Sequence, residues 1–126
     1  MRMAGALGMD VGRRTRTRDL RELIRALHPA TPGRELIRLG PEGDGGYLLP
    51  DDLDGIQCCF SPGVSTESGF ELDLAARGLC VYLADFSVNR PAESHPNFAF
   101  DKKFLGALSN ETFMTLDEWK ADRVPD

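Results

Sequence analysis

The strongest constraint on the fold is the stretch of residues 56–85, in which two short apolar runs flank one helical pattern. The runs cover residues 56–60 and 79–84, and continuous apolar runs of this length are typical of strands buried on both faces. Between them, residues 67–77 predict a helix, with Ser65 or Thr66 as its N-cap and Gly78 as its end. A strand, a helix and a strand in about thirty residues form a βαβ unit. We therefore expect an α/β fold with a parallel sheet covered by helices.

The residues before this unit predict a helix and a hairpin. Residues 18–27 carry apolar side chains at helical spacing until Pro29 ends the pattern, and we expect this amphipathic helix to pack one face on the domain. Residues 36–39 and 47–49 are apolar and flank a segment rich in glycine, which predicts a β-hairpin.

The residues after the unit show weaker patterns. A loop is expected over residues 87–97, because prolines and asparagines interrupt it. Short strands are expected at residues 98–100 and 104–108, and a short helix capped by Thr115 at residues 115–120.

Length and composition indicate one ordinary domain. Of the 126 residues, we expect 1–17 to be a disordered leader and 18–126 to form the folded domain. No apolar run approaches the roughly 20 residues of a membrane span, and the N-terminus lacks the apolar core of a signal peptide. The sequence therefore predicts a cytoplasmic protein without a membrane partner.

Charge and cysteine content argue against two classes of function. Residues 1–38 have a net charge of +5 and residues 39–126 a net charge of −10, and so acidic a body would repel a phosphate backbone. We therefore expect no nucleic-acid partner. Cys58, Cys59 and Cys80 are expected to be small buried apolar residues, because both histidines lie too far along the chain to complete a zinc site.

The loop after the first predicted strand has the properties of a cofactor loop. Small residues, among them Gly63, Ser65 and Ser68, would let backbone N–H groups and a helix N-terminus approach a ligand. Asp85 ends the second strand 22 residues after Gly63, the approximate spacing of a carboxylate that accepts hydrogen bonds from ribose hydroxyls. A nucleoside-containing cofactor fits this pattern. Val64 and Ser65 stand where a pyrophosphate would need glycines, which favours S-adenosylmethionine over a dinucleotide.

Several segments, in this order and spacing, resemble one protein family. They are Arg38-Leu-Gly with Gly43-Asp-Gly-Gly-Tyr-Leu-Leu-Pro50, Phe60-Ser-Pro-Gly-Val-Ser with Phe70-Glu71, Val81-Tyr-Leu-Ala-Asp85, and Met114-Thr-Leu-Asp-Glu-Trp119. Over residues 20–126 the chain resembles the N-terminal half of FkbM-type S-adenosylmethionine-dependent methyltransferases. The resemblance implies a Rossmann-like class I methyltransferase fold, S-adenosyl-L-methionine as the cofactor, and O-methylation of a sugar or secondary metabolite.

The resemblance also implies the positions of the cofactor-binding residues. Those at the loop and at the end of the second strand are Ser61, Gly63, Val64, Ser65, Ser68, Asp85 and Phe86. Those expected at the mouth of the site are Asp44, Gly46 and Tyr47. No residue qualifies as a catalytic base: His28 follows a predicted helix, and His95 is expected to be exposed in a loop.

The chain departs from the family at its end. The family continues into a strand with a Lys-x-Asp-x-Glu-Gly-type motif, which this sequence does not reach, so we expect a truncated domain with an open sheet edge. Three interpretations follow: the cofactor-binding portion of a methyltransferase that acts on a small-molecule or glycan acceptor; a non-catalytic remnant or interaction module; and a small dinucleotide-binding domain. The second would self-associate, or bind a complementing chain, at the open edge.

Overall fold

A computed structural model describes residues 15–31 and 33–124 of the chain. The chain divides into two compact units, residues 1–32 and 33–126. Residues 1–14 of the predicted disordered leader lie outside the described residues. The first helix begins at Thr17, which is the last residue of the predicted leader.

The first unit contains the predicted amphipathic helix, α1 (Thr17–Ala26). Its apolar side chains Leu20, Leu23 and Ile24 are between 46 and 66% exposed, so the expectation that this face packs on the domain stays a prediction. Nowhere in the described residues is a helix both long enough and apolar enough to cross a membrane.

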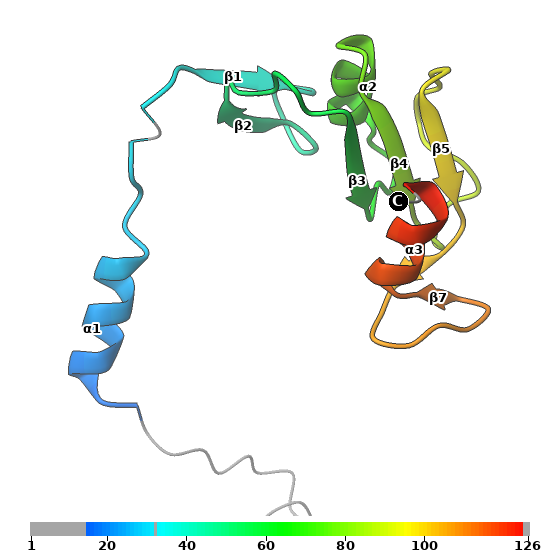
Figure 1. Ribbon diagram of the computed structural model, residues 1–126. Coiled ribbons are helices and arrows are strands. Elements are labelled where there is room, and N and C mark those ends of the chain that lie inside the picture. The colour runs from blue at the N-terminus through cyan, green and yellow to red at the C-terminus, as the bar shows by residue number, and fades with distance from the viewer. Residues whose placement is uncertain (1–14, 32, 125–126) are drawn as a thin grey trace, which may run out of the picture. The chain divides into compact units, whose positions relative to one another are not determined.

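The second unit is built on a three-stranded parallel sheet (Figure 1). Its strands β3 (Cys58–Pro62), β4 (Cys80–Ala84) and β5 (Phe98–Asp101) lie side by side in sequence order. Helix α2 (Gly69–Ala76) connects β3 to β4, which confirms the predicted βαβ unit.

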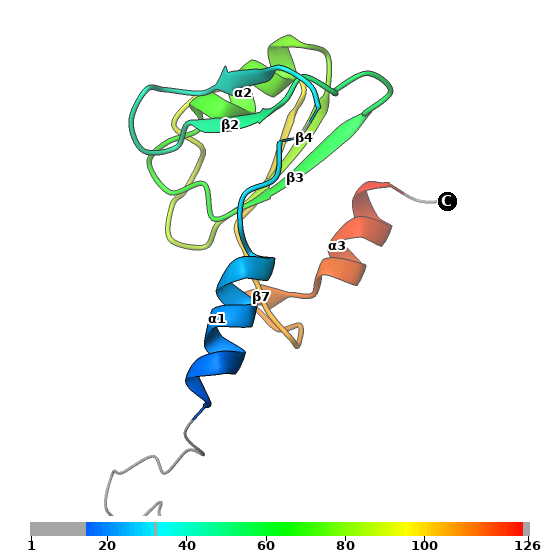
Figure 2. The same ribbon diagram turned by 90° about the vertical axis from the view of Figure 1, so that its left-hand side faces the viewer.

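Different helices cover the two faces of the sheet, as Figure 2 shows. Val81 and Leu83 of β4 are fully buried and join Leu74 of α2 in the hydrophobic core. Because side chains alternate along a strand, Tyr82 points to the opposite face. That face is covered by α3 (Leu116–Arg123), whose Trp119 is only 1% exposed.

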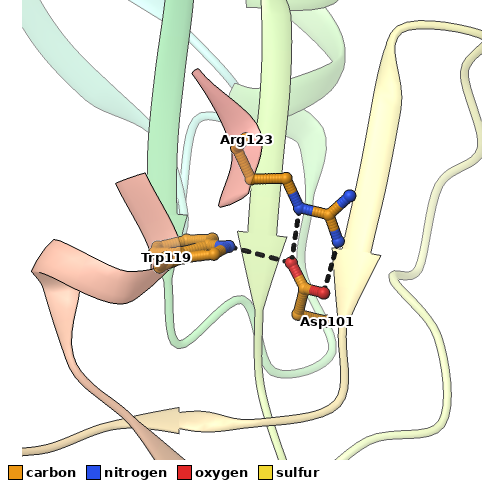
Figure 3. Close-up of polar contacts among 3 residues, drawn as sticks. All are labelled: Asp101, Trp119 and Arg123. Carbon is orange, nitrogen blue, oxygen red and sulfur yellow. Dashed lines mark hydrogen bonds and ion pairs between the residues drawn. The ribbon is translucent and has the colours of Figure 1, made fainter. Parts of the chain in front are cut away.

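Aromatic and polar contacts fix α3 on the sheet. The ring of Trp119 meets that of Phe60 edge-on, with 4.9 Å between centroids. Its indole N–H donates to Asp101 at 2.8 Å, and Arg123 pairs with the same carboxylate (Figure 3). Thr115 and Glu118 form the capping box that begins the helix, which confirms the predicted cap.

The predicted hairpin is confirmed and packs beside α2. Strands β1 (Leu36–Leu39) and β2 (Tyr47–Pro50) pair in antiparallel register. Leu39 is 2% exposed within the core, and the next N–H, that of Gly40, donates to Asp73 of α2 at 2.7 Å.

Several details differ from the sequence predictions. Helix α2 begins at Gly69 with Ser68 as N-cap, so the predicted start at residue 67 and the N-caps at Ser65 or Thr66 were wrong. Only residues 104–105 of the predicted strand 104–108 are extended, as β6 (Phe104–Leu105), which pairs with the unpredicted β7 (Phe113–Met114). Strands β3 and β4 begin one or two residues later than expected.

A further difference concerns the cysteines. Cys80 is exposed, and Cys58 and Cys59 are half-buried, so the expectation of three buried cysteines was wrong. The reason is position: Cys58 and Cys80 are the first residues of their strands, at the margin of the sheet.

We expect truncation of Trp119 to be severely destabilising. Trp119→Ala removes a buried side chain and leaves a cavity between α3 and the sheet, so the free energy of unfolding should fall by about 3–5 kcal/mol. Chemical denaturation followed by far-ultraviolet circular dichroism measures this change. Leu116→Ala is the matched control, because Leu116 lies on the same helix but is 54% exposed. Equal losses in the two variants would contradict the packing described.

Candidate functional site

A cleft of about 380 Å³ opens at the carboxyl end of β3. Its walls come from the loop after β3, the first turn of α2 and the loop of the hairpin. In sheets of parallel strands, this is the end at which ligands bind. The predicted site residues that line the cleft are Asp44, Tyr47, Ser61, Gly63, Val64 and Ser65.

The loop after β3 contains two residues with a left-handed backbone conformation. Gly63 has φ +81°, and its N–H donates to the carbonyl of Ala84 at 2.7 Å, which ties the loop to the end of β4. Ser65 also lies in the left-handed region, with φ +46°, which is uncommon for a residue other than glycine. Val64 between them is 5% exposed and is one of the residues that line the cleft.

Asp85, the residue after β4, holds this loop in place by a hydrogen bond. Its side chain is buried, with the residue only 3% exposed, and one carboxylate oxygen accepts the N–H of Ser65 at 2.8 Å. The other oxygen accepts from the N–H of Ser87 at 2.7 Å and from its hydroxyl at 2.6 Å. Burial by itself raises the pKa of the Asp85 carboxyl, but these hydrogen bonds outweigh burial and lower the pKa below its usual value.

This arrangement gives Asp85 a positioning role. Both of its oxygens accept hydrogen bonds from the protein, and Asp85 is not among the residues that line the cleft. The sequence analysis expected this carboxylate to accept hydrogen bonds from ribose hydroxyls, and that remains a prediction.

Three other predicted site residues lie outside the cleft lining. Ser68 is buried, and its hydroxyl accepts the N–H of Glu93 at 2.8 Å. Gly46 has a packing role, because a Cβ atom there would lie 1.8 Å from the carbonyl oxygen of Pro41. Phe86 is 38% exposed and packs against Phe104, with ring centroids 5.7 Å apart.

The sequence analysis missed the contribution of α2 to the cleft. Glu71 and Phe70, in the first turn of α2, line it, as do Glu67 and Thr66 just before the helix. The signal was present, because the first turn of the helix in a βαβ unit lies beside the end of the preceding strand. Phe70 and Glu71 also formed part of the motif on which the family resemblance was based.

Glu71 is a buried carboxylate at the wall of the cleft. It is 6% exposed and accepts a hydrogen bond from the hydroxyl of Ser61, at the end of β3. Next to it, the pKa of the Cys59 thiol is raised by burial and, to a smaller extent, by the charge of Glu71. Cys59 therefore stays protonated and is a weak nucleophile near neutral pH.

All charged side chains among the described residues that line the cleft are acidic. Among the described residues that line it, Asp44, Glu67 and Glu71 are carboxylates, and none is lysine, arginine or histidine. Arg38 of the hairpin directs its guanidinium to the carbonyl oxygens of Pro41 and Gly43. The cleft thus favours a positively charged ligand and disfavours phosphates.

Aromatic side chains provide the apolar part of the cleft. Tyr47 of β2 and Phe70 of α2 meet edge-to-face, with ring centroids 5.1 Å apart, and both line the cleft. Such rings can pack against a flat ring system of a ligand. The hairpin therefore supplies a carboxylate and an aromatic surface to the same wall.

Of the two histidines, only His95 belongs to the unit that contains the cleft, and it is not among the lining residues. His95 is half-buried, not exposed as expected, and its Nδ1 accepts the N–H of Asn97 at 3.1 Å. His28 follows α1 in the first unit. Within the described parts of the chain, no histidine, cysteine and carboxylate groups cluster as metal ligands would.

We expect Asp85→Asn to lower stability and to change its pH dependence. The amide leaves at least one backbone donor without an acceptor, so the free energy of unfolding at pH 7 should fall by about 1–3 kcal/mol. Because the folded-state pKa of Asp85 is lowered, its ionised form stabilises the folded protein above the unfolded-state pKa of about 3.9. This contribution is lost as the pH falls through the folded-state pKa.

The measurement is denaturant unfolding at several pH values from neutral to acid. The unmodified chain should lose stability more steeply below about pH 4 than Asp85→Asn does. Asp52→Asn, at an exposed position paired with Arg34, is the control and should follow the unmodified chain. Parallel profiles for the unmodified chain and Asp85→Asn would contradict the assigned role.

Comparison with known proteins finds no matching family model, no matching curated protein and no matching solved structure. The function of the cleft must therefore be inferred from its position in the fold and from its own chemistry.

Proposed function

We propose that the cleft binds S-adenosyl-L-methionine and that the chain is the cofactor-binding portion of a methyltransferase. The observation that carries the proposal is the charge of the cleft: three carboxylates and no basic side chain among its described lining residues. S-adenosyl-L-methionine carries a sulfonium and an ammonium group against one carboxylate, so its net charge complements this lining.

The fold is consistent with this proposal. A parallel sheet with strands in sequence order, a crossover helix between the first two, and a cleft at their carboxyl ends are features of one half of a Rossmann-like class I methyltransferase fold. The volume of about 380 Å³ lies in the usual range for small-molecule sites.

The same charge disfavours the dinucleotide alternative. A pyrophosphate carries negative charges, and its binding loops offer several glycine N–H groups. Here Val64 and Ser65 follow Gly63, and Glu67 and Glu71 would face the phosphates. Repulsion between these groups makes a dinucleotide a poor ligand.

The residues of the cleft divide into three binding roles. The backbone between Gly63 and Ser65 provides close approach to the cofactor, and Glu71 provides a negative charge for its cationic end. Tyr47 and Phe70 provide an apolar surface for its adenine ring. When bound, the cofactor supplies an electrophilic methyl group to an oxygen of a sugar or secondary-metabolite acceptor.

The chain's contribution to such a transfer would be alignment. Methyl transfer needs the acceptor oxygen, the methyl carbon and the departing sulfur in line, so positioning is the main source of rate. Among the described lining residues, the three carboxylates are the groups available as a general base near neutral pH.

Calorimetric titration of the full chain with three ligands tests the proposal. We expect saturable binding of S-adenosyl-L-methionine, weaker binding of the thioether S-adenosylhomocysteine, which lacks the sulfonium charge, and no saturable binding of NAD. The order follows from the loss of the sulfonium charge in the second ligand and from the phosphate charges of the third. Absence of S-adenosyl-L-methionine binding by a folded chain would overturn the proposal, and saturable NAD binding would favour the dinucleotide alternative.

A charge-neutral variant locates the binding site. Glu71→Gln keeps the shape of the side chain but removes its charge, so we expect the Kd for S-adenosyl-L-methionine to rise about tenfold, which corresponds to about 1.4 kcal/mol. Glu111→Gln, at an exposed position outside the cleft, should leave the Kd unchanged. Equal affinities of Glu71→Gln and the unmodified chain would place the ligand elsewhere.

A second candidate function is assembly through the outer edge of the sheet. Strand β3 pairs with β4 on one side, and no other described strand pairs with it. Unpaired backbone groups at such an edge can accept a strand from a second copy or from a complementing chain. Light scattering at several concentrations tests self-assembly: a mass twice that of the chain supports it, and a monomer mass throughout contradicts it.

A further inference from the structure

Two of the three cysteines are direct neighbours in the sheet. Cys58 begins β3 and Cys80 begins β4, and the two residues are partners in the parallel register. Register partners in a parallel pair project their side chains from the same face of the sheet. All three cysteines are free thiols, Cys80 is exposed and Cys58 is half-buried. The sheet therefore presents a pair of thiols on one face, open to reagents from solvent.

The spacing of neighbouring strands suits a bond between these thiols. Adjacent strands lie about 4.8 Å apart, and disulfides join residues whose Cα atoms are about 4.4–6.8 Å apart. The strand starts are held together by the hydrogen bond from the N–H of Cys80 to the carbonyl of Gln57, at 3.0 Å. The Cα spacing of register partners in adjacent strands therefore falls within the range that a disulfide requires.

Cys59 is half-buried like Cys58, but it differs from this pair in the face on which its side chain lies. It follows Cys58 in the strand, so its side chain points to the opposite face, and it lines the cleft. Burial raises the pKa of its thiol, which disfavours the reactive thiolate. The chain thus allows a comparison between two thiols that are register partners and one thiol on the opposite face.

We propose that Cys58 and Cys80 form a dithiol site that a hydroperoxide oxidises to an intramolecular disulfide. In the first step one thiolate attacks a peroxide oxygen, the O–O bond breaks, and a sulfenic acid and water form after proton transfer. In the second step the other thiol attacks the sulfenic sulfur, the S–S bond forms, and a second water leaves. Two thiols and one hydrogen peroxide give one disulfide and two waters. Excess dithiothreitol reverses the reaction by thiol–disulfide exchange.

This site is distinct from the candidate cofactor site. Neither Cys58 nor Cys80 is among the residues that line the cleft, although Cys59, which follows Cys58, is. The bond would close a loop that contains α2 and the turn at Gly63. Closing this loop restricts the unfolded chain, so the oxidised protein should unfold at higher denaturant concentration than the reduced protein.

The test treats the folded full chain with hydrogen peroxide, quenches it with iodoacetamide and measures the intact mass. We expect one alkylated cysteine instead of three, and a species about 2 Da lighter than the reduced protein before alkylation. Peptide mapping should connect the segment of Cys58 to that of Cys80. Dithiothreitol should restore three alkylated cysteines.

Two variants identify the partners. Cys59→Ser leaves only Cys58 and Cys80, and we expect it to form the bond and to gain the same rise in denaturation midpoint. Cys80→Ser alters an exposed side chain, and we expect no intramolecular bond and no rise. A bond that includes Cys59, disulfide-linked dimers alone, or three free thiols after treatment would overturn the proposal. Circular dichroism before oxidation verifies that each variant is folded.

Discussion

The shape of the cleft depends on the hydrogen bonds that Asp85 accepts from two loops. One carboxylate oxygen holds the N–H of Ser65, in the loop after β3, and the other holds Ser87, in the loop after β4. A buried carboxylate without hydrogen bonds would be costly, but here three donors compensate for the loss of water. These hydrogen bonds connect the two loops to the same carboxylate and so hold them together. The left-handed conformation of Ser65 is maintained by the same contact, and the wall of the cleft follows from it.

The two faces of the sheet are stabilised in different ways. On one face, Leu74 packs with Val81 and Leu83 in an apolar core. The hydrophobic effect that stabilises this core is non-directional, so small shifts of the side chains are tolerated. On the other face, directional hydrogen bonds position α3. The indole N–H of Trp119 and the guanidinium of Arg123 both donate to the carboxylate of Asp101. A tryptophan buried to 1% exposure needs such a partner for its N–H.

Parallel pairing also separates two kinds of chemistry along the strands. At the carboxyl end of β3, the loop, α2 and the hairpin bring carboxylates and aromatic rings into one cleft. At the amino ends, the register aligns Cys58 with Cys80 on a single face. Both arrangements follow from the direction and register of β3 and β4, since a shift of one residue would reverse the face of every side chain.

Local sequence patterns predicted the helices, the hairpin and the βαβ unit, because each depends on periodicity and on turn residues within a short segment. They did not predict the true start of α2: serine and threonine occupy three positions before the helix, and Ser65 is held out of it by Asp85, 20 residues away. The pairing of β6 with β7 was missed for a similar reason, since two-residue strands carry no periodic signal.

The sequence by itself determined the order of the elements and the parallel sheet, because apolar runs, helix ends and glycine turns act over a few residues. Only the tertiary structure decided that Asp44, Glu67 and Glu71 share one cleft, that Asp85 lies behind it, and that Cys58 faces Cys80. These relations depend on strand register, on the packing of the hairpin against α2, and on hydrogen bonds between residues far apart in the chain. Such contacts arise only when the separate elements bury their apolar faces together.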